Sequence, residues 1–444
     1  MKRRFKISIT VLVFYFPISM MIGAYDHKFK QISRMPTPKR IWEYIGKTLP
    51  PFLYSIEKDK IVRSNTNPSM NLRRVEVAFT SQVIEGNKMG HRGVIFMPAD
   101  SEVYQKPERR GKVVIVTHRF GDDTMEGNYA EPIAARTGYP TMDLLLPGEY
   151  DGEDGEGKWL RYFRKLALET QNPSNHDFIR SAIPYLQALD IFSDLFKEKK
   201  IRAIIGGHSK RAYYAYTAAA MDSDRIASVI FMGCERLYVR KEFPEAVKPF
   251  TTQKYVKCPV FYIGATNEDG YEMFNISKIQ EGMERPWTIE YIPNYRHGSR
   301  SEKQFMDWQM WVAHIFDGRP ITKISDLSHE ETEKGTIFRA CIHSPNKLIQ
   351  VKVWYVYCDD VPYWRDLMWY PEIMKPKDGN FYEGYVEGKL PDAWLVEVKD
   401  VAFGFPGYIS SLPRDITHKP TKERKSRGSR SRNWEPKIKK KDGN

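Results

Sequence analysis

Short apolar runs alternate with stretches of helical apolar spacing between about residues 110 and 317. Such runs predict buried parallel strands, and the stretches between them predict helices. The expected strands are 112–117, 141–146, 203–205, 226–232, 259–264 and 287–292, and the expected helices are 128–137, 175–199, 210–221, 276–283 and 302–316. The strands 73–81 and 92–98 precede them as an antiparallel pair. The pattern therefore predicts an α/β fold, a mostly parallel sheet with helices on both faces.

Beyond residue 325 the pattern changes to an alternation of apolar and polar residues, typical of half-buried antiparallel strands. This alternation covers 336–343, 348–357 and 393–398. It predicts a small antiparallel β domain, similar to a sandwich, that docks on the first domain. The expected division is an N-terminal segment at 1–24, a lead-in at 25–72, the main domain at 73–325, the β domain at 326–412 and a basic tail at 413–444. The tail has few apolar residues, so we expect it to be disordered.

Two features of the β domain leave alternatives open. Its aromatic residues form either a compact core or a sugar-binding face. Cys341 and Cys358 lie on two strand-like runs joined by a tight turn, so they can face each other. The sequence contains no CxxC motif and no metal-ligand spacing, and we predict neither a metal nor a cofactor. The aromatic residues are Tyr355, Tyr357, Tyr363, Trp364, Trp369 and Tyr370.

Charge is concentrated at the two ends of the chain. The formal net charge is +13 over 444 residues, but the first six residues carry +4 and residues 418–444 carry +8. The remainder is nearly neutral, so a specific nucleic-acid-binding surface is not indicated. The basic tail can instead contact an anionic polymer, lipid or cell wall. Residues 1–24 join a basic start to an apolar run, which predicts an exported protein, or alternatively one that keeps an N-terminal membrane anchor.

The most informative motif follows the apolar run at 203–205. Gly206 and Gly207 permit a sharp turn, Ser209 follows, and a helix is expected from residue 210. A strand, a Gly-x-Ser turn and a helix make the nucleophile elbow of the α/β-hydrolases. Such an elbow presents a serine hydroxyl beside the N-terminus of a helix. One departure is that Arg211 occupies the position of the last glycine of Gly-x-Ser-x-Gly.

Two further residues follow later strands in the order that this fold uses for its catalytic triad. Asp269 follows the strand at 259–264, and His297 follows the last strand of the domain. Ser209 is the expected nucleophile, His297 the base that removes its proton, and Asp269 the acid that orients the imidazole. Glu268, beside Asp269, is the reserve candidate for the acid.

Donors for an oxyanion are expected from the backbone of Lys210 and from the loop after the strand at 112–117. That loop has Arg and Phe where glycines are usual, and each lost donor costs about 10²–10³ in rate. This departure supports an alternative, a non-catalytic binding or signalling protein on a hydrolase scaffold. The cations of Lys210 and Arg211 can also hold a carboxylate or phosphate of a ligand. The loop residues are His118, Arg119, Phe120 and Gly121.

Several strings resemble the PhoPQ-activated pathogenicity-related family, which includes secreted bacterial proteins. They are Ser209-Lys210-Arg211, Pro293-Asn294 with His297, Gly318-Arg-Pro, Val351-Lys-Val-Trp354 and Arg365-Asp366-Leu367. The resemblance covers about residues 200–400. It implies an α/β-hydrolase fold, a small β domain and a triad of Ser209, Asp269 and His297, but no particular substrate.

The string Gly207-His-Ser-Lys-Arg-Ala212 also resembles the elbow of glucuronoyl esterases, with Lys210 in place of their arginine. Taken together, the sequence predicts an exported serine hydrolase that cleaves a carboxylic ester through an acyl-enzyme. The expected substrate is a small-molecule or polymer-linked ester.

Overall fold

The computed structural model describes residues 37–49, 52–84, 86–117, 129–146, 155–170, 172–233, 255–268, 287–298, 300–358 and 366–415. The export segment expected at 1–24, the helix expected at 276–283 and residues 416–444 of the tail expected at 413–444 lie outside these ranges, whereas residues 414–415 of that tail form a strand. Within them, no helix is both long enough and apolar enough to cross a bilayer.

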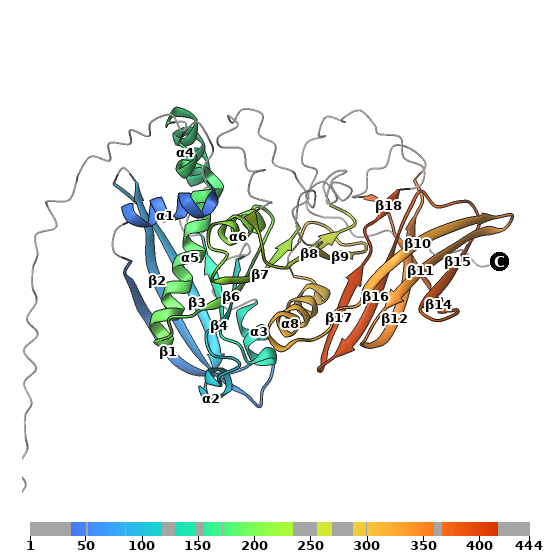
Figure 1. Cartoon of the computed structure of the whole chain (residues 1–444), viewed down its shortest axis with the longest axis horizontal. Coiled ribbons are helices and arrows are strands. Elements are labelled where there is room, and N and C mark those ends of the chain that lie inside the picture. Colours follow the sequence, from blue (N-terminus) through green and yellow to red (C-terminus); the bar gives the residue numbers. More distant parts are fainter. Residues whose placement is uncertain are drawn as a thin grey trace, which may run out of the picture.

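The larger domain contains a nine-stranded sheet (Figure 1). Its strands from β5 to β9 pair in parallel, whereas β1, β2 and β3 pair antiparallel with their neighbours. In spatial order the strands are β1 (Tyr54–Arg63), β2 (Asn71–Ile84), β3 (Asn87–Pro98), β5 (Thr141–Leu145), β4 (Lys112–Thr117), β6 (Arg202–His208), β7 (Ile226–Met232), β8 (Val260–Ala265) and β9 (Thr288–Ile292). The predicted α/β-hydrolase fold is confirmed, and β1, from the expected lead-in, adds an edge strand.

Helices cover both faces of this sheet (Figure 1). One face carries α1 (Pro38–Thr48), α5 (Asp177–Phe196) and α6 (Lys210–Met221); the other carries α3 (Ala130–Thr137) and α8 (Glu302–Asp317). The helix α4 (Gly155–Thr170) contacts α5, and the short α2 (Glu102–Gln105) lies between β3 and β4. Alternate residues of β4 point into different cores. Val113 and Ile115 pack with α5 and α6 in one core, and Val114 and Val116 pack with α3 and α8 in the other. Burial on both faces explains why the strands are continuous apolar runs.

The C-terminal domain consists of two antiparallel sheets, as predicted. One contains β10 (Lys323–Thr332), β11 (Gly335–His343), β15 (Phe381–Glu387) and β14 (Lys375–Pro376); the other contains β13 (Tyr370–Ile373), β12 (Lys347–Val356), β16 (Ala393–Ala402) and β17 (Phe405–Ser410), with β18 (Arg414–Asp415) beside β16. Phe338, Val353 and Trp394 are fully buried between the sheets.

The two runs that carry Cys341 and Cys358 do not form the expected hairpin, because β11 and β12 belong to different sheets. Both cysteines are free thiols. Of the aromatic residues, Trp369 is 1% exposed and joins the core, whereas Tyr370 is 48% exposed. Tyr363 and Trp364 lie outside the described ranges.

The two domains are joined through β17, which packs on α8 and β9 (Figure 1). Gly407 of β17 lies against α8 so closely that a Cβ would be 2.4 Å from Cγ of Met310. The Tyr291 N–H, on the edge strand β9, donates to Oγ of Ser410 at 2.8 Å. The β domain thus covers the edge of the large sheet, and edges left bare invite pairing with other chains.

Candidate active site

Ser209 is the single residue between the end of β6 and the start of α6. Its backbone has φ 60° and ψ −134°, a conformation that non-glycine residues rarely adopt. Its N–H donates to the Met232 carbonyl of β7 at 2.9 Å, and its carbonyl accepts from the Ala212 N–H at 2.9 Å. The neighbouring elements therefore hold Ser209 in the strained geometry of a nucleophile elbow.

The close approach of α6 to β6 depends on glycine at position 207. A Cβ there would lie 2.6 Å from the carbonyl of Arg211 and 2.9 Å from Oγ1 of Thr117. Tyr185 of α5 supports the same turn, because its hydroxyl donates to the Arg211 carbonyl at 3.2 Å. The side chain of Arg211, at the usual glycine position, is buried.

Glu268 lies on the loop after β8, and His297 lies on the loop after β9. Nδ1 of His297 lies 2.9 Å from both carboxylate oxygens of Glu268. The Glu268 side chain is 9% exposed and that of His297 is 40% exposed. A carboxylate only accepts hydrogen bonds, so Nδ1 carries a proton, and in the neutral imidazole Nε2 presents its lone pair. The ring of His297 lies 4.5 Å, centroid to centroid, from that of His208, which precedes Ser209. His297 is therefore beside the elbow.

Gly233, just after β7, makes room for these side chains. It has φ 53°, and a Cβ there would lie 2.8 Å from Nε2 of His208 and 3.4 Å from Oε1 of Glu268. A larger residue would displace one of these two groups, and a positive φ favours glycine in any case.

Among the residues predicted for the site, Ser209 and His297 both follow carboxyl ends of parallel strands, and His297 packs on His208, the neighbour of Ser209. The reserve acid, Glu268, is the one that contacts the histidine, while Asp269 lies outside the described residues. Lys210 opens α6, so its N–H lies at the positive end of the helix, next to the serine.

The loop from His118 to Gly121 also lies outside the described residues. Its starting point is nevertheless defined, because Thr117, the last residue of β4, is in register with Gly207 of β6. The loop therefore leaves the sheet beside the elbow, where an oxyanion-binding loop of this fold begins.

The β domain supports the loops that carry Glu268 and His297, a role that sequence patterns did not reveal. Nδ2 of Asn294 donates to the Trp369 carbonyl at 2.9 Å, and the Trp369 N–H donates back to Oδ1 at 2.8 Å. Nδ2 of Asn267 donates to the Leu367 carbonyl at 2.6 Å. The loops of Glu268 and His297 are thus both fastened to the segment 367–369. The only signal in the sequence was Asn294 in the string before His297.

A buried carboxyl, Asp143 on β5, holds the start of α3, which follows the oxyanion loop. Its Oδ2 accepts from the N–H groups of Ala130 at 3.1 Å and Tyr129 at 3.4 Å. Burial raises the pKa of Asp143 to about 7, and these two hydrogen bonds limit the rise. Ionisation of Asp143 near neutral pH therefore works against the folded state.

The first prediction concerns the pH dependence that Asp143 gives to stability. Its raised pKa contributes stability that is fully present below about pH 4, near the pKa of an unfolded Asp, and lost as pH rises through about 7. Asp143→Asn does not titrate. We expect the unfolding free energy of the wild type to fall relative to the variant over this window, by about 1.4 kcal/mol for each tenfold difference in acid dissociation constant between the folded and unfolded states. Urea unfolding of both proteins from pH 4 to 8 measures this change in relative stability. A difference in unfolding free energy between wild type and variant that stays constant with pH would contradict the prediction.

The chain shows distant likenesses to proteins of known structure. No family model matches the chain, and no curated protein gives a significant match. Among solved structures, the chain is similar to an acetyl xylan esterase from a Paenibacillus species, with 11% identity, a TM-score of 0.41 and coverage of 59% of this chain and 87% of that one.

Two other similar structures have comparable statistics. An S-formylglutathione hydrolase from Agrobacterium tumefaciens has 13% identity, a TM-score of 0.40 and coverage of 59% of this chain and 99% of that one. A cold-adapted esterase from an Arctic intertidal metagenomic library has 16% identity, a TM-score of 0.36 and coverage of 60% and 95%. Likenesses this distant do not indicate an activity, and the fold rests on the strand order described above.

Proposed function

We propose that the protein is a serine hydrolase that cleaves carboxylic esters, with Ser209 as nucleophile, His297 as base and Glu268 as the acid that orients it. One observation carries the proposal. A serine held at positive φ between a strand and a helix directly follows His208, and the ring of His208 packs on the imidazole of His297, whose Nδ1 is bonded to a buried carboxylate. These are the groups that acyl transfer requires.

The reaction follows from the roles of these groups. Oγ of Ser209 attacks the ester carbonyl carbon while Nε2 of His297 takes the hydroxyl proton. The tetrahedral intermediate expels the alcohol, which receives that proton, and leaves an acyl-serine. Water then attacks the acyl-serine, His297 again moves the proton, and the carboxylic acid is released. Glu268 stabilises the imidazolium in both halves without becoming protonated.

Two sets of donors are proposed for the oxyanion, the Lys210 N–H and the loop from His118 to Gly121. The ammonium of Lys210, the residue after the serine, is proposed to hold an acidic group of the substrate. The resemblance of the elbow to that of glucuronoyl esterases supports uronate esters as the first substrates to test. Membership of the PhoPQ-activated pathogenicity-related family is proposed on the strings around Ser209 and His297, and it adds no substrate.

The second prediction tests the nucleophile directly. A fluorophosphonate probe is expected to label the wild type at Ser209, because the probe reacts only with an activated serine hydroxyl. Labelling is expected to vanish in Ser209→Ala and to persist in the matched control Ser223→Ala, at the other end of α6. Mass spectrometry of the labelled peptide identifies the site.

Absence of labelling in the folded wild type would overturn the enzymatic proposal. It would favour the binding or signalling protein that Arg119 and Phe120 in the oxyanion loop suggest. If labelling succeeds, a panel of aryl acetates, acetylated sugars and uronate methyl esters, with and without Ser209→Ala, identifies the acyl group.

A further inference from the structure

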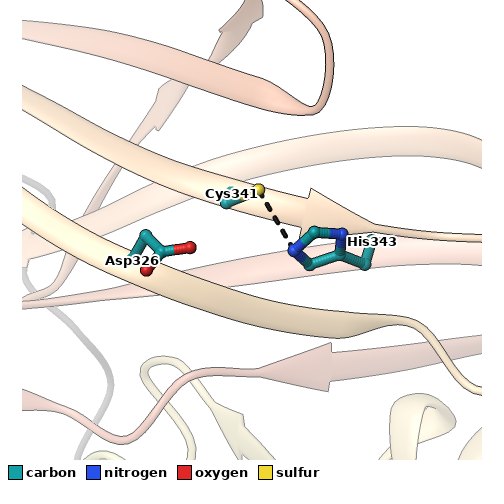
Figure 2. A group of neighbouring side chains, drawn as sticks. All are labelled: Asp326, Cys341 and His343. Atoms are coloured by element: carbon teal, nitrogen blue, oxygen red, sulfur yellow. Dashed lines mark hydrogen bonds between the residues drawn. The ribbon is translucent and has the colours of Figure 1, made fainter.

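Three side chains with metal-binding atoms converge on β10 and β11 of the C-terminal domain, remote in sequence from the proposed triad. They are Asp326, Cys341 and His343 (Figure 2). One ligand atom from each lies within 4.8 Å of the other two. Sγ of Cys341 is 3.2 Å from Nε2 of His343. Cys341 is buried, while Asp326 and His343 are exposed, so the cluster is accessible to solvent from one side.

The backbone explains how these side chains meet. Cys341 and His343 are two residues apart on one strand and so point to the same face of the sheet. Their partners across the ladder are Ser325 and Lys323, so regular pairing would turn Asp326 to the opposite face. A bulge between Ser325 and Ser328 breaks that alternation, and Asp326 has φ 49° there. Bulges commonly serve to redirect a side chain, and here the carboxylate is brought beside the thiol and the imidazole.

The donor set determines which cation fits. A thiolate, an imidazole and a carboxylate together suit zinc and related first-row transition metals, whereas calcium and magnesium prefer oxygen ligands alone. Zinc bonds of about 2.0–2.3 Å in a tetrahedron place neighbouring ligand atoms roughly 3.3–3.8 Å apart. The separation of 3.2 Å between Cys341 and His343 is already close to this range. Rotation of the exposed Asp326 side chain completes it.

We propose that Asp326, Cys341 and His343 form a binding site for a divalent transition metal of the zinc class, with water at the fourth position. On binding, the thiol of Cys341 releases its proton to solvent and the sulfur forms a bond to the metal. The thiolate and the carboxylate then carry two negative charges, which balance the charge of the cation.

Neighbouring polar groups fit this arrangement. Oγ of Ser325 donates to Oδ2 of Asp326 at 2.8 Å, which leaves Oδ1 for the metal. The amide of Asn380 lies 3.4 Å from Nδ1 of His343. When Nε2 binds a metal, Nδ1 carries the proton, and the Asn380 amide rotates to accept it through oxygen. Such outer hydrogen bonds fix the imidazole of a metal ligand.

The site would join β10 to β11 where the chain enters the β domain. One residue before β10, Oγ1 of Thr322 is 2.7 Å from Oγ of Ser344, next to His343. Thr322 also donates to Asp400, whose other oxygen accepts from the buried Arg319 just after α8. A metal here therefore reinforces the connection between the two domains rather than the chemistry at Ser209.

Cobalt gives a direct test on the full chain, because a thiolate bound to Co²⁺ absorbs in the near ultraviolet. After dialysis against a chelator, the wild type is expected to bind one equivalent of Co²⁺ with this absorption, and Zn²⁺ is expected to displace it. Cys341→Ser is expected to abolish the absorption. His343→Gln and Asp326→Asn are expected to weaken affinity at least about tenfold. Zn²⁺ is expected to raise the melting temperature of the wild type but not of His343→Gln.

Two controls make the outcome specific. Cys258→Ser removes a thiol from the other domain, and His329→Gln removes an exposed imidazole from the same strand, β10; both are expected to bind Co²⁺ like the wild type. Absence of thiolate absorption in the folded wild type, or absorption that survives Cys341→Ser, would overturn the proposal. Because no step involves Ser209, this result is independent of the fluorophosphonate experiment.

Discussion

Replacing Glu268 with Gln is expected to lower kcat for ester hydrolysis by about 10³–10⁴-fold and to leave KM nearly unchanged. The two carboxylate oxygens lie at equal distance, 2.9 Å, from Nδ1 of His297. As a pure acceptor, the carboxylate keeps the proton on Nδ1 and leaves Nε2 to act on Ser209. A glutamine can donate its N–H to Nδ1 and stabilise the opposite tautomer, in which Nε2 carries the proton and cannot act as a base.

The matched comparison is Asp269→Asn, because the sequence placed Asp269 first and Glu268 in reserve. We expect Asp269→Asn to retain most of the turnover. Steady-state kinetics on the best substrate of the ester panel measure both variants, and melting temperatures show that each is folded. A larger loss in Asp269→Asn than in Glu268→Gln would return the role of the acid to Asp269.

The second large effect is expected on stability, at the junction between the domains. Lys303 of α8 forms an ion pair with Glu397 of β16, and its Nζ lies 3.7 Å from Oε1 of Glu290 on β9. Glu290 is fully buried and Glu397 is 4% exposed. Burial raises the pKa of Glu290 well above its usual range, and the neighbouring Glu397 carboxylate adds to the rise. Lys303 therefore supplies the positive charge that offsets the cost of burying these two carboxyl groups.

Lys303→Met is expected to lower the unfolding free energy by about 3–5 kcal/mol, because it leaves buried carboxyl groups without their counter-ion. The loss is expected to be largest near pH 8 and to shrink toward pH 4. The raised pKa of Glu290 means that its contribution to stability is present below the unfolded pKa of about 4.3 and is lost as pH rises through the folded value. Urea unfolding at several pH values measures both effects.

Lys399→Met supplies the matched control for Lys303→Met. Both ammonium groups lie over the ring of Tyr408, at 4.3 Å for Lys303 and 5.2 Å for Lys399. Both variants therefore lose a similar cation–π contact, worth about 0.5–1 kcal/mol. Only Lys303→Met also leaves the carboxyls of Glu290 and Glu397 uncompensated. If the two variants lose equal stability, the ion pair at the domain junction contributes nothing measurable.

The location of the candidate site was predictable to the extent that it depends on positions at strand ends. Ser209 and His297 were identified because each follows an apolar run, and parallel strands bring their carboxyl ends to one edge of the sheet. The contact of Glu268 with His297 was not predictable, because local periodicity does not fix where the side chain of a loop residue points. The role of the segment 367–369 was not predictable either. Its backbone carbonyls accept hydrogen bonds from Asn267 and Asn294, and every residue type has a backbone carbonyl.

The sequence by itself determined the alternation of strands and helices in the main domain, the change to an antiparallel β domain and the residue types available for catalysis, because these follow from local periodicity and from glycine at sharp turns. Only the tertiary structure revealed the contact of Glu268 with His297 and the β-domain segment that fastens the loops of these two residues. It also brought Asp326, Cys341 and His343 together, although their spacing indicated no metal site. A bulge in β10 turned Asp326 toward its neighbours. Such contacts depend on the register between strands distant in sequence, and small shifts in register change every side-chain neighbour.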